Sequence, residues 1–305
     1  MSTQTEEIAA TLGIWIVALF LATILYGMGI LQGWLYFQWY HKDGWNLKVM
    51  VLAVMCLETV QICTSFAATY DVVIEHFGDM DAIYTISWFE PTQLLAGYLS
   101  ALIVQLYFAS VVYQLNGPGV KRWLFTVPIV LLAIVEIGAT IAQVVLIKTM
   151  IHSFKDMGRI KWIYSLLSSA SFACDVLIAV ALYITLKSKR TNIQEFGGHG
   201  YFPSRTNRIL HKLTVYAINR GVLTAVTAAV NLILFLSKPN TFYYFIGLLT
   251  SSKLYMNSML ASLNSRHHII QSVDDETCHS WNSIHITASM RDTFSTTMIP
   301  IWFHK

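Results

Sequence analysis

Four ionisable side chains lie near the middle of four long apolar stretches of this sequence. Three are acids, Glu58, Glu136 and Asp175, and the fourth is Lys253. If each stretch is a helix with a rise of about 1.5 Å per residue, these side chains lie near the centre of a bilayer. A charge at that depth costs roughly 2.5–3.5 kcal/mol on insertion scales, so such residues face a bundle interior and pair. The sequence therefore predicts a polar centre inside a membrane-spanning helical bundle.

Lys253 has two interpretations. Asn257 follows it by four residues, so both side chains share one helix face. A buried lysine amine can serve as the counter-ion of a ligand or form a Schiff base. It can instead pair with an acid on a neighbouring helix and lock the bundle, and the sequence favours this structural role.

Two of the acids have polar neighbours on their own helix face. Asp175 follows Ser168 and Ser171 as one polar stripe, and Glu58 precedes Gln61 by three residues. Small hydroxyl side chains allow helices to approach closely and to form hydrogen bonds across the contact. Helix packing and contact with a ligand or ion both remain open for these residues.

The third acid is more isolated. Glu136 stands in an apolar run, with only Thr140 and Gln143 on its face. Burial without a partner favours the neutral form of a carboxyl, and a neutral carboxyl can donate a proton. Further along, Asn219 and Arg220 lie near one end of another apolar stretch, where Arg220 either extends to the interface or joins the polar centre.

Seven apolar stretches position these residues. Of the 305 residues, 55% are hydrophobic and 12% are charged, whereas soluble domains carry about 25% charged residues. A span uses about 20 residues, so seven spans leave no room for a separate soluble catalytic domain. The fold predicted is all-α, a polytopic bundle of seven transmembrane helices. The predicted spans are Leu12–Phe37, Leu47–Thr69, Pro91–Leu115, Trp123–Ile147, Trp162–Leu186, Leu213–Leu236 and Thr241–Leu263.

The chain divides into three regions. Residues 1–11 form a short N-terminal segment, residues 12–264 the membrane domain, and residues 265–305 a polar tail expected to be disordered. Lys and Arg are more frequent in alternate loops, which predicts the N-terminus outside and the C-terminus in the cytoplasm. The protein is expected in the plasma membrane or an endomembrane.

Composition also limits partners and cofactors. Basic residues flank helices without forming a continuous patch, which excludes nucleic acid. His267 and His268 are too few for a zinc site, and neither a metal nor another cofactor is expected. Expected partners are membrane lipid, a small apolar or amphipathic ligand, and a cytoplasmic protein that contacts the basic loop 187–212 and the tail.

A family resemblance covers residues 172–266 most strongly. It depends on Asp175–Ile178, on Val215–Asn219 and above all on Lys253–Arg266, which reads KLYMNSMLASLNSR. These motifs resemble a basidiomycete fungal family of seven-helix membrane proteins that is known only as a domain of unknown function. The resemblance implies a receptor-like membrane fold without an established chemistry. Arg220 departs from it, because the family usually has Thr at that position.

Three functions fit the sequence. The first is a receptor or sensor, which the seven spans, the basic loop and the Ser/Thr-rich tail favour. The second is an intramembrane enzyme similar to terpene cyclases, with Glu58, Glu136 and Asp175 as acids; a proton or ion pathway ranks third. The predicted polar centre comprises Glu58, Gln61, Glu136, Asp175, Asn219, Arg220, Lys253 and Asn257.

Overall fold

The computed structural model is a bundle of long helices. It describes residues 9–79, 82–116, 119–150, 153–154, 159, 161–196, 222–227, 229–231, 233–234 and 243–278. Within these ranges there is no strand, only an isolated bridge between Thr85 and Ser153. The all-α fold predicted from the sequence is therefore confirmed.

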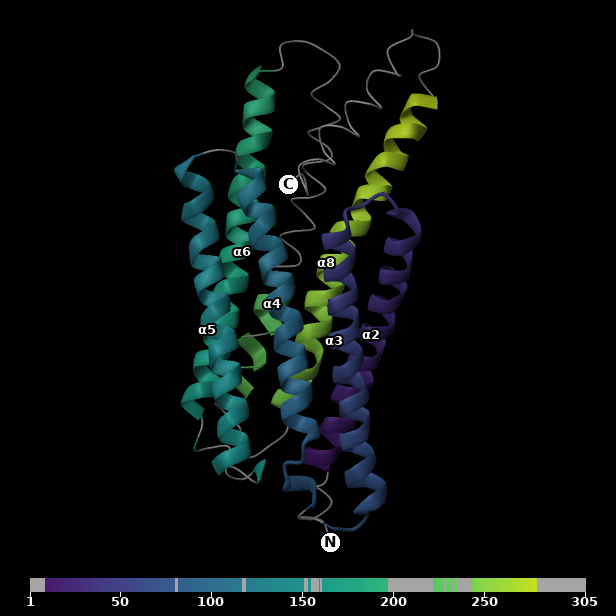
Figure 1. Ribbon diagram of the computed structural model, residues 1–305, viewed down its shortest axis with the longest axis vertical. Helices are drawn as coiled ribbons and strands as arrows, with labels where there is room; N and C mark the ends of the chain where they lie inside the picture. Colours follow the sequence, from purple (N-terminus) through teal and green to yellow (C-terminus); the bar gives the residue numbers. More distant parts are fainter. Residues whose placement is uncertain are drawn as a thin grey trace.

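In the part of the chain that the structure describes, six long helices run nearly parallel to one axis (Figure 1). Two short π-helical turns, η1 and η2, extend α2 and α3 at one end of the bundle, and a 3-10 turn, η3, precedes α4. A shorter apolar helix, Val222–Asn231, lies between α6 and α8 in the sequence. The bounds are η1 Ala9–Gly13, α2 Ile14–Trp39, α3 Trp45–Tyr70, η2 Asp71–Glu75, η3 Ala82–Tyr84, α4 Phe89–Leu115, α5 Val120–Met150, α6 Lys161–Phe196 and α8 Tyr244–Cys278.

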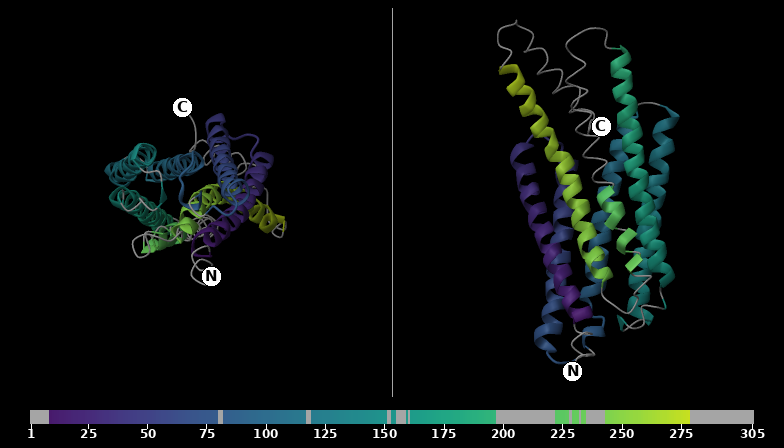
Figure 2. Two further views of the ribbon diagram at one scale, coloured as in Figure 1. Left: turned by 90° about the horizontal axis from the view of Figure 1, so that it is seen from below. Right: turned by 180° about the vertical axis from the view of Figure 1, so that it is seen from behind.

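Two helices occupy the centre of the arrangement. α8 packs against α2, α3 and α4, and α4 packs against α3, α5, α6 and α8. The views in Figure 2 accordingly show α2 and α3 on one side and α5 and α6 on the other. Side chains on α4 and α8 therefore meet the interior faces of every other long helix.

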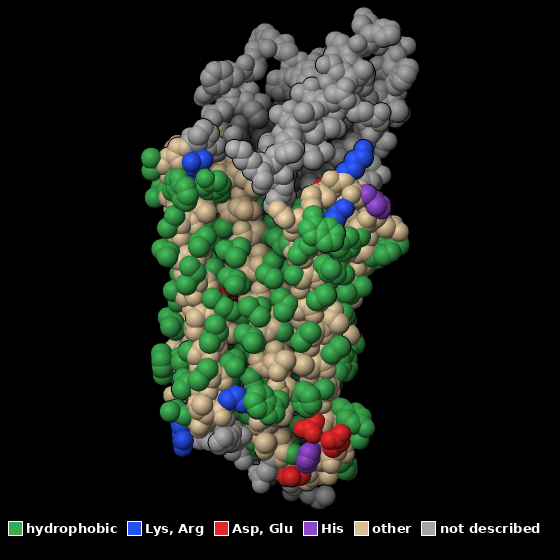
Figure 3. Space-filling model, in the orientation of Figure 1, with side chains coloured by type: hydrophobic (Ala, Val, Ile, Leu, Met, Phe, Trp, Pro, Cys, Tyr) green, Lys and Arg blue, Asp and Glu red, His purple; other side chains and the backbone are tan. Residues whose placement is uncertain are grey.

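The surface of the bundle fits a lipid environment. Hydrophobic side chains cover its flank, and charged side chains gather toward its two ends (Figure 3). Large apolar side chains on the flank are open to the surroundings; Phe20, for example, is 64% exposed. A monomeric soluble protein rarely exposes so continuous an apolar surface.

Among the described residues, five helices are long and apolar enough to cross a membrane. Together with the apolar flank, they make this a multi-pass membrane protein. The five are Ala10–Trp39, Trp45–Glu75, Phe89–Leu115, Arg122–Met150 and Trp162–Ser188.

The sequence predicted seven spans, two more than the five candidates found among the described residues. α8 corresponds to the predicted seventh span, but its serines, Asn257 and Lys253 lower its hydropathy, so it is not among the five. Its central position explains why it carries these residues, since a helix enclosed by others meets little lipid. The predicted sixth span, 213–236, lies only partly within the described residues. Seven spans therefore stay a prediction.

Two helices continue past their predicted ends. α6 runs beyond Leu186 to Phe196, and α8 runs beyond Leu263 to Cys278. The extension of α6 contains neither Gly nor Pro, and Gly197 follows its last residue in the sequence, as is typical of a helix end. The predicted tail at 265–305 thus begins as helix, and its residues 279–305 lie outside the described ranges.

The two ends of the bundle differ in charge. We call the end drawn at the bottom of Figures 1 and 3 the acidic end, because α3 leads there into η2, which carries Asp71 and Glu75; Lys148, in the last turn of α5, lies at the same end. The opposite, basic end carries Lys42, Lys48, Arg122 and Lys187. The predicted orientation places the acidic end outside the cell, and it remains a prediction.

Candidate functional site

Two polar clusters lie on different faces of α8. Lys253 and Tyr255 are two residues apart on this helix, so their side chains point about 200° apart around its axis. Lys253 contacts α3, whereas Tyr255 contacts α6. The four ionisable residues predicted to share one centre are therefore divided between two clusters.

The paired cluster comprises Glu58, Gln61, Ser252 and Lys253. Lys253 Nζ lies 3.1 Å from Glu58 Oε2, and both side chains have 0% exposure. Lys253 also donates to Gln61 Oε1, and Ser252 Oγ donates to the same oxygen at 2.6 Å. The structural role predicted for Lys253, a pair with an acid on a neighbouring helix, is the arrangement found.

A glycine on α4 makes room for this cluster. A Cβ at Gly97 would lie 2.6 Å from Gln61 Nε2, closer than real Cβ contacts allow. One turn away, Ser65 Oγ donates to Gln93 Oε1 at 2.5 Å and joins α3 to α4 again. Sequence reasoning missed Gly97, Gln93 and Ser252. They could have been found from the sequence as small or polar residues inside apolar helices, because such residues are typical of helix contacts in membranes.

The carboxyl cluster comprises Gln105, Glu136, Ser171, Asp175 and Tyr255, and it joins α4, α5, α6 and α8. Gln105 Nε2 donates to Glu136 Oε2 at 2.7 Å. Tyr255 OH donates to Asp175 Oδ2 at 2.6 Å and lies 3.2 Å from Ser171 Oγ. Both carboxyls are thus held by neutral donors inside the bundle, where they are 3% and 2% exposed.

Of the three other predicted site residues, Asn257 lies within the described residues, and its side chain bonds to α2 and to the backbone of α8. Asn257 Nδ2 donates to the Leu25 carbonyl at 2.8 Å, and its Oδ1 accepts from Gln32 Nε2 at 3.2 Å. Asn257 therefore ties α8 to α2. Asn219 and Arg220 lie outside the described residues.

A pocket separates the two clusters. Gln61 and Ser252 of the paired cluster and Ser171 and Tyr255 of the carboxyl cluster all contribute to its wall. Its cavity volume, counted as the space open to the centre of a water-sized molecule, is about 30 Å³. Its lining is formed by Gln61, Leu94, Gly97, Tyr98, Ala101, Ser168, Ser171, Thr224, Thr227, Asn231, Gly247, Leu248, Ser251, Ser252 and Tyr255.

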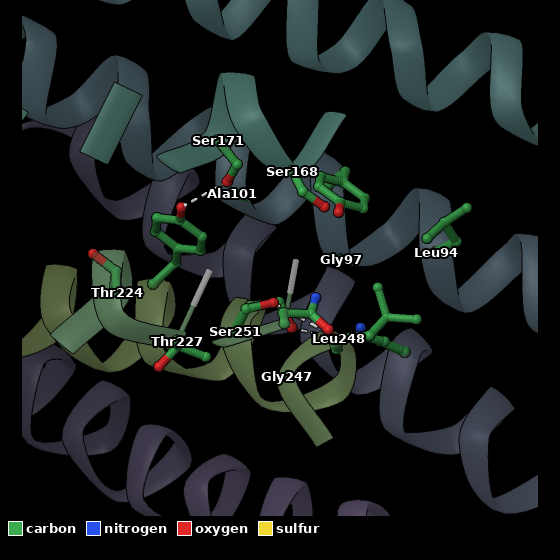
Figure 4. Close-up of a pocket in the computed structure, with 15 residues that line it drawn as sticks. Leu94, Gly97, Ala101, Ser168, Ser171, Thr224, Thr227, Gly247, Leu248 and Ser251 are labelled. Carbon is green, nitrogen blue, oxygen red and sulfur yellow. Dashed lines mark hydrogen bonds between the residues drawn. The ribbon is translucent and has the colours of Figure 1, made fainter. Parts of the chain in front are cut away.

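The described lining of this central pocket mixes polar and apolar groups and carries no charge. In Figure 4, Ser168 and Ser171 of α6 lie across the pocket from Gly247 and Ser251 of α8. Hydroxyl and amide groups alternate with small apolar surfaces, and no described lining residue is charged. Such a wall can bind a neutral molecule that combines oxygen atoms with apolar carbon.

The described residues provide no obvious metal site. No three His, Cys, Asp or Glu side chains come together among them as a ligand set. Cys56, Cys63 and Cys174 are not in disulfide bonds.

One of the comparisons with known proteins found a match to part of the chain. A model of a family of unknown function (DUF6534) matches residues 171–268. The matched region includes Ser171, Asp175, Lys253 and Tyr255, so it contributes to both clusters. No curated protein and no solved structure matches the chain. The chemistry of this membrane protein must therefore be argued from its interior.

Proposed function

We propose that this membrane protein is a seven-helix receptor or sensor that binds a small neutral amphipathic molecule in the central pocket. The observation that carries the proposal is the lining, which presents hydroxyl and amide groups of both clusters and no charged group among its described residues. A charged ligand would lose its hydration there without a counter-ion, whereas a neutral alcohol or ketone would keep its hydrogen bonds.

The pocket is coupled to buried charge through two side chains of α8. Ser252 Oγ donates to Gln61 and lies 3.2 Å from Glu58, and Tyr255 OH donates to Asp175. A ligand oxygen that competes for either hydroxyl changes the bonds on that face of α8. A ligand shifts a conformational equilibrium only by its difference in affinity for the two states, and these competing bonds supply such a difference.

Helix α8 would transmit this conformational shift to the basic end of the bundle. The helix continues from the pocket to the basic end, where it runs to Cys278 (Figure 1). A rotation or displacement of α8 would therefore reach that end of the molecule. The predicted cytoplasmic partner at loop 187–212 and the tail would bind there.

An intramembrane acid catalyst is the second candidate. Glu136 favours it, because its Oε1 atom is buried and has no hydrogen-bond partner in the described structure. A general acid must approach the reacting atom to within about 3 Å or through one water molecule. The described lining of the central pocket contains no carboxyl group, so the receptor ranks first.

The proposal is tested by the thermal stability of the protein in lipid nanodiscs with primary alcohols from butanol to decanol. A ligand that binds only the folded state raises the unfolding temperature. We expect an optimum chain length, because a pocket admits only a limited length of apolar chain. A steady trend with chain length would indicate partition into lipid and contradict the proposal.

Two matched variants locate the effect. Thr227 lines the pocket and Thr149 lies on the exposed surface of α5, yet each bonds the carbonyl four residues earlier in its own helix. Thr227→Leu should fill space in the pocket and remove the optimum, and Thr149→Leu should keep it. Equal responses of the two variants would place the alcohols outside the pocket.

A further inference from the structure

A second pocket lies at the acidic end of the bundle. Its polar wall is formed by Glu90 and Gln93 of α4 and Gln143 of α5, and its aromatic wall includes Phe154 and Phe245. Leu94 and Leu248 border both this pocket and the central one. The two pockets differ in chemistry, because only the second has a carboxylate in its described wall.

The aromatic wall belongs to a three-ring cluster of Trp15, Phe154 and Phe245. The Trp15 ring stacks on Phe245 with centroids 5.5 Å apart, and Phe154 meets Phe245 edge-on at 5.7 Å. Trp15 is almost fully buried behind them, at 1% exposure. The faces of aromatic rings carry partial negative charge and attract cations within about 6 Å.

The carboxylate of Glu90 is nearly buried, and its hydrogen bonds come from neutral donors, the Ser87 hydroxyl and the backbone amides of Ser87 and Glu90. Its side chain is 8% exposed, and Ser87 Oγ donates to its Oε2 at 2.9 Å. The nearby cation Lys148 directs its Nζ elsewhere, to the Ser87 carbonyl at 2.9 Å and over the Trp88 ring at 3.7 Å. Lys148 therefore acts on Glu90 only through its nearby charge, and the carboxylate can still accept hydrogen bonds from a cation that enters the pocket.

Gln143 supplies an independent indication of a ligand. Its side chain is 2% exposed, and its Oε1 is a buried acceptor without a hydrogen bond in the described structure. A buried acceptor left without a donor costs about 1–3 kcal/mol, so a donor from a ligand would be stabilising here. The same pocket thus offers a carboxylate, a free amide oxygen and aromatic rings.

We propose that this pocket binds a small organic ammonium ion that carries at least one N–H group. The ammonium group would pair with Glu90 and donate to Gln143 Oε1, and its carbon substituents would contact Phe154 and Phe245. Divalent metal ions fit less well, since they prefer several carboxylates and the described lining has one. The inference is independent of the ligand in the central pocket.

The test uses tert-butylammonium and its neutral isostere tert-butanol. The protein is placed in nanodiscs of phosphatidylglycerol, a lipid whose headgroup has no ammonium group. Isothermal titration calorimetry measures binding of each probe. We expect tert-butylammonium to bind at least about tenfold more tightly than tert-butanol. Equal binding of the two probes would overturn the proposal.

Two acid variants distinguish binding in this pocket from general attraction of the probe to surface charge. Glu90→Gln keeps the bond with Ser87 but removes the charge, so affinity for tert-butylammonium should fall about tenfold or more. Glu75→Gln removes an exposed acid at the same end and should leave affinity unchanged. The same loss in both variants would contradict the assignment.

If Glu90→Gln does not fold, a gain-of-function variant tests the proposed ammonium site instead. Gln143→Glu places a second carboxylate at the free acceptor, and it should raise affinity for tert-butylammonium while leaving tert-butanol unaffected. No gain would overturn the proposal.

The natural ammonium group could belong to a free amine or to a lipid headgroup, and the lipid composition distinguishes them. Weaker apparent binding of the probe in phosphatidylethanolamine discs assigns the pocket to a headgroup. Unchanged binding assigns it to a free amine. Either result is compatible with ammonium recognition, which the isostere comparison alone decides.

Discussion

The two clusters on α8 hold their carboxyls in different ways. In the paired cluster, Glu58 faces a lysine amine 3.1 Å away, and both groups are fully buried. In the carboxyl cluster, Glu136 and Asp175 accept hydrogen bonds from an amide and a phenol. Glu58 is therefore stabilised by the charge of its partner. Glu136 and Asp175 are bonded by neutral donors, which can still donate to a carboxyl that has lost its charge.

This difference suggests different roles for the two faces of α8. A buried ion pair is costly to break, because removal of one partner leaves an uncompensated charge in a low dielectric. A carboxyl that is bonded to neutral groups tolerates loss of its charge much better. The paired cluster would then fix α8 against α3, and the carboxyl cluster would allow adjustment between α8 and α6.

Removal of the Lys253 amine should have the largest effect on stability. Lys253→Ala leaves Glu58 buried without its cation, so we expect the free energy of unfolding to fall by about 3–5 kcal/mol. Reversible unfolding in mixed micelles measures the loss. Adding Glu58→Gln to this variant should recover part of the stability, because the uncompensated charge is gone. Wild-type stability of Lys253→Ala would show that the pair does not hold the bundle.

A change at Gly97 should have an intermediate effect. Gly97→Ala forces Gln61 to move, which disturbs the bond with Lys253, and overpacking of this kind costs about 1–3 kcal/mol. Gly138 on α5 is the matched control, because a Cβ there would meet nothing within 4 Å. Gly138→Ala should therefore be neutral or slightly stabilising. The same unfolding assay compares them, and equal costs would remove Gly97 from the paired cluster.

Neutralising Glu136 should have the smallest effect. Glu136→Gln keeps an acceptor for Gln105 Nε2, so we expect a cost below about 1 kcal/mol in the same assay. Glu58→Gln is the matching change in the paired cluster and should cost more, because Lys253 then loses its counter-ion. If the two variants lose equal stability, the proposed difference between the clusters is wrong.

Much of the molecule could be predicted from local sequence properties. Hydropathy and length identified the long helices, although the ends of α6 and α8 fall ten and fifteen residues beyond Leu186 and Leu263. The cost of a charge in hydrocarbon also indicated that Lys253 pairs with an acid. These inferences succeed because they depend on residue types and on the repeat of a single helix.

The choice of partners could not be predicted in the same way. Glu58 and Lys253 are 195 positions apart, and three carboxyls at similar depth were equally available to the lysine. Asn257 shares a face with Lys253 in the helix repeat, yet it bonds to α2 while Lys253 bonds to α3. Partner choice depends on how each helix is rotated against its neighbours, which no single helix encodes.

The sequence by itself thus determined that this is a helical membrane protein, and it predicted polar side chains buried inside the bundle. The tertiary structure decided that these side chains form two clusters, that Gly97 makes room for one of them, and that pockets with different linings lie beside them. The physical reason is range: burial of apolar surface acts on each segment separately, whereas hydrogen bonds and ion pairs act over about 3 Å and require the assembled bundle.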